Sequence, residues 1–341
     1  MHGSPVHQNK VRKSAGGPAA GPRPRGKAGE VLAVLDLGTN NCRLLIARPV
    51  AHDRFRAVDS FSRIVRLGEG VTVSGLISDA AMERTIAALK ICAQHIAKSG
   101  ARHVRAIATQ AARQAANADI LVARAQAEAG IALTVISAEA EADLAALGCA
   151  PLIGQKYKGA LIFDIGGGST EIIHLRRGTK EGFDKIFAAS LPHGVVSLSE
   201  RYATEPGRTG FEAMRRDMRE RFAPYAAEGF NLKTEHLLGT SGTVTTLAAL
   251  ALGLPRYNRA RVDGSWHDTR QVSRLVERLA GLDVPALARL GPIGPERADL
   301  MLAGCAIFSA ICALWPSRML RVADRGLREG MLRQLRQELG L

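Results

Sequence analysis

The sequence predicts an α/β protein that is built from two similar lobes. Short apolar runs typical of strands alternate with longer amphipathic stretches typical of helices, which is the pattern of layered α/β proteins. The 341 residues are enough for two domains at roughly 100–200 residues each. One local pattern, an apolar strand followed by an Asp-x-Gly turn and a second apolar strand, occurs twice, around Asp36 and around Asp164. Two copies at a domain-sized separation predict a duplicated unit with a cleft between its halves.

The first copy of this pattern contains polar side chains that suit an anion. Its first strand ends at Asp36, the turn reads Leu-Gly-Thr-Asn-Asn, and the second strand begins at Arg43. Thr39 and Asn40 can donate side-chain hydrogen bonds to phosphate oxygens, next to the backbone of Gly38. Arg43 can add a charge-assisted hydrogen bond. Ordinary turn chemistry is the alternative, because Asn tolerates left-handed backbone.

The second copy is a glycine-rich turn between Asp164 and Glu171. Its glycines allow the backbone to approach a ligand closely and to direct N–H groups at it, which suits a phosphate. No lysine follows, and the next element is a strand, so the turn is neither a P-loop nor a dinucleotide-binding turn. Asp164, at the end of the strand, is free to hold a metal ion. A plain tight hairpin is the alternative. The turn consists of Gly166, Gly167, Gly168 and Ser169.

One acidic residue is predicted to lie on the buried face of a helix. The helix starts at the capping residue Ser137 and runs to about Leu147. Glu139 and Glu141 differ by about 200° around its axis, so they occupy different faces. Glu141 shares the apolar face with Leu144. Because burial raises the pKa of a carboxyl group, Glu141 can take a proton from water near neutral pH, and we predict that it is a general base. A solvated acid near the helix N-terminus is the alternative.

Two further positions are candidates for phosphate binding. Arg113 comes four residues after a predicted strand over 104–109 and opens a helix predicted over 113–129. Ligands of open α/β sheets bind beyond the carboxyl ends of strands, so its guanidinium suits a phosphate chain, with a surface ion pair as the alternative. Ser241 lies in a small-residue loop, 238–244, whose N–H groups can hold an anion where a helix begins. Capping of that helix alone also explains the loop.

Charge and composition narrow the ligand class. The net charge is +14, and the segment 1–29 carries six of these charges with no acid, which predicts a disordered basic tail. The remaining +8 favours polyanionic ligands. Aromatic residues make up only 4%, which argues against a surface that stacks single-stranded nucleic acid. We therefore expect nucleic-acid contact only through the tail, and weakly.

The chain shows no sign of a membrane segment or of secretion. Its apolar runs stay below the ~18 residues of a spanning helix, and the first thirty residues lack a hydrophobic stretch. Five widely spaced cysteines without a C-x-x-C pair suit the reducing cytosol. We expect a cytoplasmic protein, and the sequence leaves open whether it is a homodimer.

Taken in order, the motifs resemble those of the exopolyphosphatase / guanosine pentaphosphate phosphohydrolase family from about residue 30 onward. This resemblance implies the actin, Hsp70 and sugar-kinase superfamily, with two ribonuclease-H-like lobes and an active site in the cleft between them. The lobes are expected at 30–137 plus 320–341 and at 138–319. The motifs that carry the resemblance are Asp36–Arg43, Ala108–Arg113, Ser137–Ala142, Asp164–Glu171, Gly239–Gly242 and Arg325–Gly330.

The resemblance also implies roles for individual residues. Glu141 would activate water against a terminal phosphorus, and Arg113 would contact the phosphate chain. Asp164 and Glu171 would lie near a divalent cation, usually Mg²⁺, and both glycine turns would hold phosphates. The chain departs from the family at Thr39 and Asn41, which are often serine, and in the Glu139-Ala140 pair, where a second acid is displaced. These departures bear on substrate preference. The chain looks like the short form of the family, without a further HD-type helical domain.

The expected activity is hydrolysis of the terminal phosphoanhydride of inorganic polyphosphate. Guanosine pentaphosphate is the alternative substrate for the same reaction. Two alternatives from other classes stay open, namely an ATP-dependent kinase of the same superfamily and a non-catalytic sensor of polyphosphate or alarmone.

Overall fold

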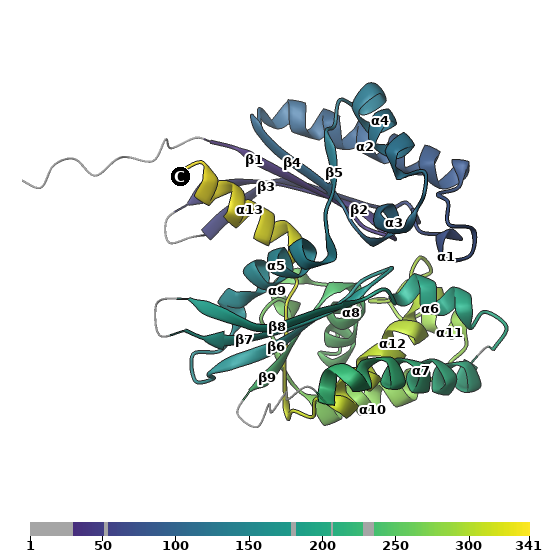
Figure 1. Cartoon of the computed structure of the whole chain (residues 1–341). Helices are drawn as coiled ribbons and strands as arrows, with labels where there is room; N and C mark the ends of the chain where they lie inside the picture. Colours follow the sequence, from purple (N-terminus) through teal and green to yellow (C-terminus); the bar gives the residue numbers. More distant parts are fainter. Residues whose placement is uncertain (1–29, 51–53, 179–181, 206, 228–234) are drawn as a thin grey trace, which may run out of the picture.

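The structure, a computed structural model, describes residues 30–50, 54–178, 182–205, 207–227 and 235–341. The predicted tail, 1–29, lies outside the described residues. Two α/β lobes pack against each other, and each contains one mixed sheet (Figure 1). In the described part of the chain, every helix is too short or too polar to traverse a bilayer.

The first lobe has a five-stranded sheet in the order β3-β2-β1-β4-β5. Strands β1, β2 and β3 are antiparallel neighbours, whereas β4 and β5 run parallel to β1. The strands are β1 (Leu32–Leu37), β2 (Asn41–Val50), β3 (Arg54–Ile64), β4 (His103–Ala108) and β5 (Leu133–Val135). The helices of this lobe are α1 (Val71–Ser74), α2 (Asp79–Ser99), α3 (Gln110–Gln114) and α4 (Ala118–Ala129).

The second lobe repeats this topology and adds one strand. Its sheet has the order β10-β11-β9-β6-β7-β8, and without β10 the order and directions match those of the first sheet. This match confirms the predicted duplication and the ribonuclease-H-like lobes. The strands are β6 (Gly159–Ile165), β7 (Thr170–Arg177), β8 (Phe183–Leu191), β9 (His236–Thr240), β10 (Trp266–Asp268) and β11 (Met319–Val322).

The remaining helices cover the second sheet and join the lobes. Six of them are α6 (Val195–Arg201), α7 (Gly207–Ala227), α8 (Ser241–Ala251), α9 (Arg259–Val262), α10 (Thr269–Leu279) and α11 (Val284–Ala288). The others are α5 (Ala138–Cys149), which a 3₁₀ turn over Ala150–Leu152 follows, α12 (Ala298–Leu314) and α13 (Leu327–Glu338). The largest core lies between the second sheet and helices that include α7, α8 and α12, where Phe163, Phe211, Phe222, Phe308 and Trp315 are buried.

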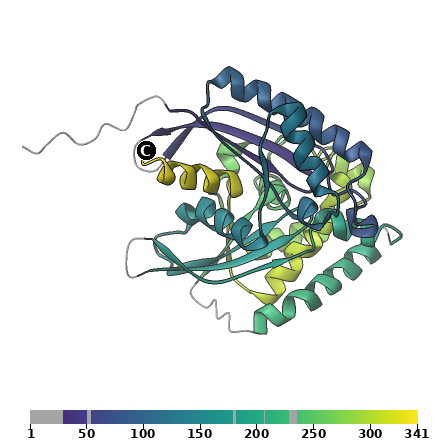
Figure 2. The same ribbon diagram turned by 45° about the horizontal axis from the view of Figure 1, so that its top comes forward.

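Helices α5 and α13 connect the two lobes. Leu144 of α5 and Met331 of α13 share one apolar core with Leu32 and Val34 of β1, and α13 lies beside α5 in both views (Figure 1, Figure 2). The helices approach so closely that a Cβ added at Gly330 would lie 1.9 Å from the carbonyl oxygen of Leu144. The final helix therefore packs on the first lobe, as expected.

Two sequence expectations need correction. The boundary at residue 320 has to move, because the whole of β11 is a strand of the second sheet. The single helix expected over 113–129 is two helices, α3 and α4, with an extended residue at Ala115. Residues of another segment hold this break in the helix. The N–H of Ala116 donates to the carbonyl of Gly75, and the Asn117 side chain forms hydrogen bonds with the backbone of Ile77.

Candidate active site

The two glycine turns occupy equivalent positions in the two lobes and contact each other. A Cβ added at Gly167 would lie 3.0 Å from the Thr39 Cβ and 3.1 Å from the Asn40 nitrogen, and one added at Gly168 would lie 2.4 Å from the Thr39 Oγ1. Glycine is needed here because the turns approach at backbone distance. The expectation that the turns face each other across the interlobe gap is confirmed.

The backbone of the second turn is oriented by helix α6. The N–H groups of Val195 and Val196 donate to the carbonyls of Gly166 and Gly167, at 3.0 and 2.8 Å. Because C=O and the following N–H point in opposite directions across a trans peptide, the N–H groups of Gly167 and Gly168 point away from α6. This is the orientation that an anion between the turns requires.

The first turn is closed by its own backbone and carries one unsatisfied polar atom. The N–H of Gly38 donates to the carbonyl of Asn41 at 2.9 Å. The side-chain Oδ1 of Asn40 is buried and has no hydrogen-bond partner among the described residues. Because an amide carries both an acceptor and a donor group and can rotate to exchange them, this side chain can present either one to a ligand.

The strands that flank the turns carry two equivalent residue pairs with opposite electrostatics. Asp36 on β1 is the direct cross-strand partner of Arg43 on β2. At the same place in the second lobe, Asp164 on β6 faces Glu171 on β7. Directly opposed residues of antiparallel strands have their Cβ atoms about 5 Å apart. The first lobe therefore presents an acid with a base, and the second lobe presents two acids.

Glu141 is placed near both pairs by helix α5. The helix begins at Ser137, whose hydroxyl oxygen accepts from the N–H of Ala140. The Glu141 side chain is 13% exposed, whereas that of Glu139 is 79% exposed, so the predicted difference between the two faces is confirmed. Nη1 of Arg113 lies 2.7 Å from Oε2 of Glu141. The two residues expected to activate water and to bind phosphate thus form an ion pair.

Burial dominates the electrostatics of Glu141. It raises the pKa of the carboxyl group to about 7, against the lowering effect of Arg113 and with additional repulsion from Asp36 and Asp164. A carboxyl with this pKa is half deprotonated near neutral pH, which is the condition under which a general base is most effective.

The other acids are electrostatically coupled to Glu141. Burial raises the pKa of Asp164 to about 6, opposed by Arg43 and reinforced by Asp36. Burial together with the charges of Glu141 and Asp164 raises the pKa of Glu171 well above its usual range, although the Ser190 hydroxyl donates to it at 2.7 Å. We call the four acids the carboxylate cluster; its members are Asp36, Glu141, Asp164 and Glu171.

The pair Asp164 and Glu171 fits a magnesium ion that has few protein ligands. The described residues contain no group of three or more His, Cys, Asp or Glu side chains arranged around one ion. Mg²⁺, however, usually takes one or two carboxylates and completes its shell with water and substrate phosphates. Two buried acids that face each other are costly when both are charged, and a divalent cation would relieve that repulsion.

Ser241 forms a hydrogen bond to the strand end that precedes the second turn. Its hydroxyl donates to the carbonyl of Ile165, at the end of β6, and its backbone is left-handed, with φ of 82°. The hydroxyl proton is therefore used inside the protein, and an anion at this place would be held by backbone N–H groups.

Three residues near the site escaped the sequence analysis. Gln110 accepts a hydrogen bond from Nη2 of Arg113 at 2.8 Å. Gly326, before α13, is so close to Asp164 that an added Cβ would lie 3.9 Å from its Oδ2. Burial lowers the pKa of Arg328, whose surroundings include Arg43 and the negative charge of Asp36. All three residues belong to motifs that carried the resemblance, at 108–113 and at 325–330, so a signal existed for each of them.

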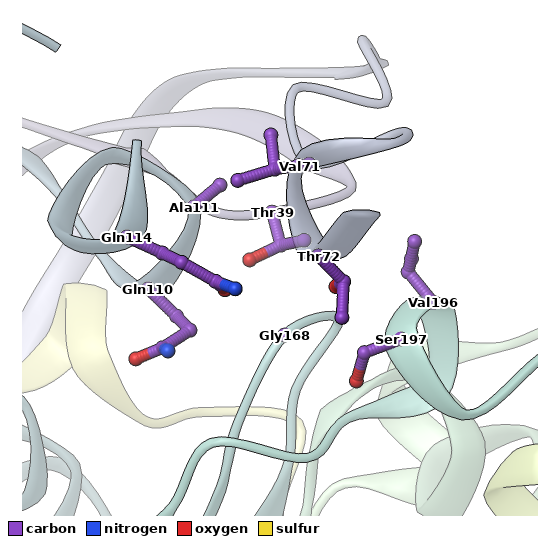
Figure 3. Close-up of a pocket in the computed structure, with 10 residues that line it drawn as sticks. Thr39, Val71, Thr72, Gln110, Ala111, Gln114, Gly168, Val196 and Ser197 are labelled. Atoms are coloured by element: carbon purple, nitrogen blue, oxygen red, sulfur yellow. The ribbon is translucent and has the colours of Figure 1, made fainter. Parts of the chain in front are cut away.

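A small cavity lies beside the turns at the interface of the lobes (Figure 3). Its volume is about 10 Å³, which is at the lower limit for one water molecule. Nearby, Arg66 contacts Asp299 at 3.0 Å and the N–H of Gly70 donates to Glu200 at 2.9 Å. The lobes are thus closed on each other, and a phosphate chain between the turns requires them to separate. The lining residues are Thr39, Gly68, Val71, Thr72, Gln110, Ala111, Gln114, Gly168, Val196 and Ser197.

Comparison with known proteins gives one consistent result. Residues 45–338 match the Ppx/GppA phosphatase family. Exopolyphosphatase 2 of Mycobacterium tuberculosis is 32% identical over 316 residues, which cover 88% of this chain and 97% of that protein. A guanosine-5'-triphosphate,3'-diphosphate pyrophosphatase of Photobacterium profundum is 31% identical over 309 residues, which cover 90% of this chain but 59% of that protein.

Solved structures agree with these sequence matches. An exopolyphosphatase-like protein superimposes with a TM-score of 0.83 at 26% identity, covering 91% of this chain and 99% of the other. A Ppx/GppA family member from Aquifex aeolicus gives a TM-score of 0.75 at 27% identity, with coverage of 92% and 99%.

Proposed function

The chain belongs to the Ppx/GppA phosphatase family, and we propose that it is an exopolyphosphatase that releases orthophosphate from the end of inorganic polyphosphate. The observation that carries the proposal is the carboxylate cluster, in which Glu141, with a pKa of about 7, lies close to the two facing glycine turns. Members of this family are phosphatases that act on phosphoanhydrides, so the proposal concerns the substrate and the residues that act on it.

In the proposed reaction, Glu141 accepts a proton from a water molecule as the water oxygen attacks the terminal phosphorus. The bridging P–O bond breaks, and its electrons leave with the shortened chain. The N–H groups of Gly167 and Gly168 stabilise the phosphoryl oxygens, which is the main catalytic task in phosphoryl transfer. Arg113 exchanges its contact with Glu141 for a phosphate oxygen, which frees the carboxylate to act on water.

Asp164 and Glu171 are the residues that would hold Mg²⁺. When bound, the ion would neutralise part of the negative charge on the phosphate chain. Arg43, the cross-strand neighbour of Asp36, keeps a positive charge beside the first turn. Thr39 and Asn40 supply side-chain donors on that side.

Two features favour inorganic polyphosphate. The net charge of +8 outside residues 1–29 attracts a long polyanion more strongly than a short one. A relative at 32% identity that covers nearly the whole chain carries the name exopolyphosphatase. Guanosine pentaphosphate is the second candidate, because the relative from Photobacterium profundum is named for hydrolysis of such a nucleotide.

One assay separates the candidates. Purified protein with Mg²⁺ receives polyphosphate or guanosine pentaphosphate at equal phosphate concentration, and released orthophosphate is measured at two salt concentrations. We expect faster release from polyphosphate, with an apparent affinity that falls steeply with salt as counterions are released. Faster release from guanosine pentaphosphate would select the second candidate. Tight binding without release, equal to that of Glu141→Gln, would indicate a sensor, and transfer of phosphate from ATP to an acceptor other than water would indicate a kinase.

A further inference from the structure

Arg113 is held by three acceptors, and one of them is a side chain with no assigned role. Its Nη1 donates to the carbonyl of Ile136 at 3.0 Å and to Glu141 at 2.7 Å. Its Nη2 donates to Oε1 of Gln110 at 2.8 Å. The first two acceptors engage one terminal nitrogen of the guanidinium. Gln110 is the partner of the other terminal nitrogen, Nη2, and holds the end of the guanidinium that does not contact Glu141.

The Gln110 side chain also touches the second lobe. A Cβ added at Gly168 would lie 3.0 Å from the Cγ of Gln110 and 3.2 Å from its Cβ. Figure 3 shows Gln110 at the cavity between the lobes, on the side of the first lobe and close to the turn that carries Gly168. One side chain therefore packs against a proposed phosphate-binding turn and bonds the proposed phosphate-binding arginine.

We propose that Gln110 is a positioning residue that holds Arg113 ready for a phosphate chain bound beside the turn containing Gly168. The inference rests on the proposed function, because it assumes that a phosphate chain is the ligand. An amide suits this task chemically. It accepts a hydrogen bond from the guanidinium without neutralising it, so the positive charge of Arg113 stays available for a phosphate oxygen. A carboxylate at position 110 would compete with the substrate for that charge.

A double-mutant cycle tests the proposal through the Michaelis constant for polyphosphate. We expect Gln110→Ala to raise KM about tenfold, as for the loss of a hydrogen bond to a charged group, with kcat changed less than about threefold. In an Arg113→Ala background the same substitution should change KM less than about twofold, because residues that act through one contact are not additive. The isosteric Gln110→Glu should raise KM more than Gln110→Ala.

The matched control is Gln114→Ala. Gln114 is exposed, has the same side chain and lies one turn further along the same short helix. We expect its KM to remain at the wild-type value. Equal losses from Gln110→Ala and Gln114→Ala would overturn the proposal in favour of general packing at the cavity. Additive effects of Gln110→Ala and Arg113→Ala would overturn it as well.

The failure of this inference is distinguishable from failure of the proposed function. If the wild type releases phosphate but the effects of the two substitutions are additive, only the role of Gln110 is rejected and the proposed function stands. If the wild type binds polyphosphate without releasing phosphate, the proposed function fails, and the same cycle is measured on the dissociation constant of polyphosphate by titration calorimetry. If the wild type neither binds polyphosphate nor releases phosphate from it, the proposed function and the role of Gln110 are both rejected.

Discussion

The two lobes share one topology and differ at one decisive pair of residues. In each sheet an acid lies near the end of a central strand, at Asp36 and at Asp164, and begins an Asp-x-Gly turn. The residue opposite the acid is Arg43 in the first lobe and Glu171 in the second. Burial raises the pKa of the acid in both lobes, and Arg43 opposes this effect at Asp36. In the second lobe Glu171 has a raised pKa as well, through burial and repulsion from Glu141 and Asp164.

This difference indicates how a duplicated fold acquires distinct halves. The strand order and the position of the turn are the same in both lobes. Arg43 on β2 and Glu171 on β7 then decide whether the neighbouring acid has a positive or a negative residue opposite it. Glu141 enters on helix α5 and faces the acids of both lobes. The substitutions below change one lobe or the other and so test this asymmetry. The first concerns Glu141, which lies near the acids of both lobes.

Removal of the shared base should have the largest effect. Glu141→Gln keeps the shape of the side chain and its contact with Arg113 but cannot accept a proton. We expect polyphosphate turnover to fall by at least ~100-fold, the lower range for loss of a general base, with polyphosphate binding retained. Orthophosphate release and equilibrium binding measure the two quantities. Glu139→Gln, at an exposed position on the same helix, is the control. Turnover close to wild type would remove Glu141 from this role.

Neutralising the second lobe's acid pair should come next. Glu171→Gln leaves Asp164 without its like-charged partner, so we expect the Mg²⁺ concentration for half-maximal activity to rise about tenfold or more. The apparent Tm without metal should rise, because a buried repulsion is removed. Arg43→Gln in the first lobe should instead raise KM for polyphosphate at an unchanged Mg²⁺ requirement. Identical Mg²⁺ titrations for wild type and Glu171→Gln would contradict the assignment.

The turns themselves should differ in their tolerance of a methyl group. At Gly168 an added Cβ would overlap Thr39 of the opposite lobe at 2.4 Å, whereas at Gly38 the nearest atom is the Asn41 oxygen at 3.5 Å. Neither glycine has a left-handed backbone. We expect Gly168→Ala to lower kcat/KM about tenfold, as for overpacking of roughly 1.4 kcal/mol, and Gly38→Ala to stay within about twofold. Equal losses would show that contact between the turns is not required.

The protonation of Glu141 should appear directly in the pH dependence of activity. Because Glu141 must be deprotonated and its pKa is about 7, kcat/KM should fall about tenfold for each pH unit below that value, as it does below the pKa of an essential base. A profile that is flat from pH 5 to pH 8 would contradict a base with this pKa.

The same groups should make stability fall as pH rises. The folded-state pKa values of Glu141 and Asp164 are raised, to about 7 and about 6, so the native chain retains protons that the unfolded chain has lost. Their contribution to the free energy of unfolding is therefore largest below pH ~4 and is lost as pH rises through 6 and 7. Thermal denaturation without ligand should show a lower Tm at pH 8 than at pH 5. Glu141→Gln should flatten the difference.

The parts of the site that are local in sequence were predictable. Both turns, the capping of α5 by Ser137 and the different exposure of Glu139 and Glu141 follow from spacing and residue type. The repeated Asp-x-Gly pattern predicted the duplication because the whole unit recurs. These features need no information about distant residues.

The parts that depend on distant contacts were not predictable. The alanine-rich stretch after Arg113 favours an unbroken helix, and only bonds from Gly75 and Ile77 interrupt it. Strand β3 lies at the edge of its sheet and is mostly exposed, so it lacks the apolar run of a buried strand. The role inferred for Gln110 depends on its contacts with Arg113 and with a turn of the other lobe.

The joint between α5 and α13 has a consequence for biosynthesis. One face of the first sheet, including Leu32 and Val34, is covered by Met331 and Leu335, which the ribosome adds only after the entire second lobe. A nascent chain must therefore carry an open apolar surface while some two hundred further residues emerge. Because of this order of synthesis, we expect a chaperone to shield the apolar surface during that interval, and we do not expect the first lobe to mature independently.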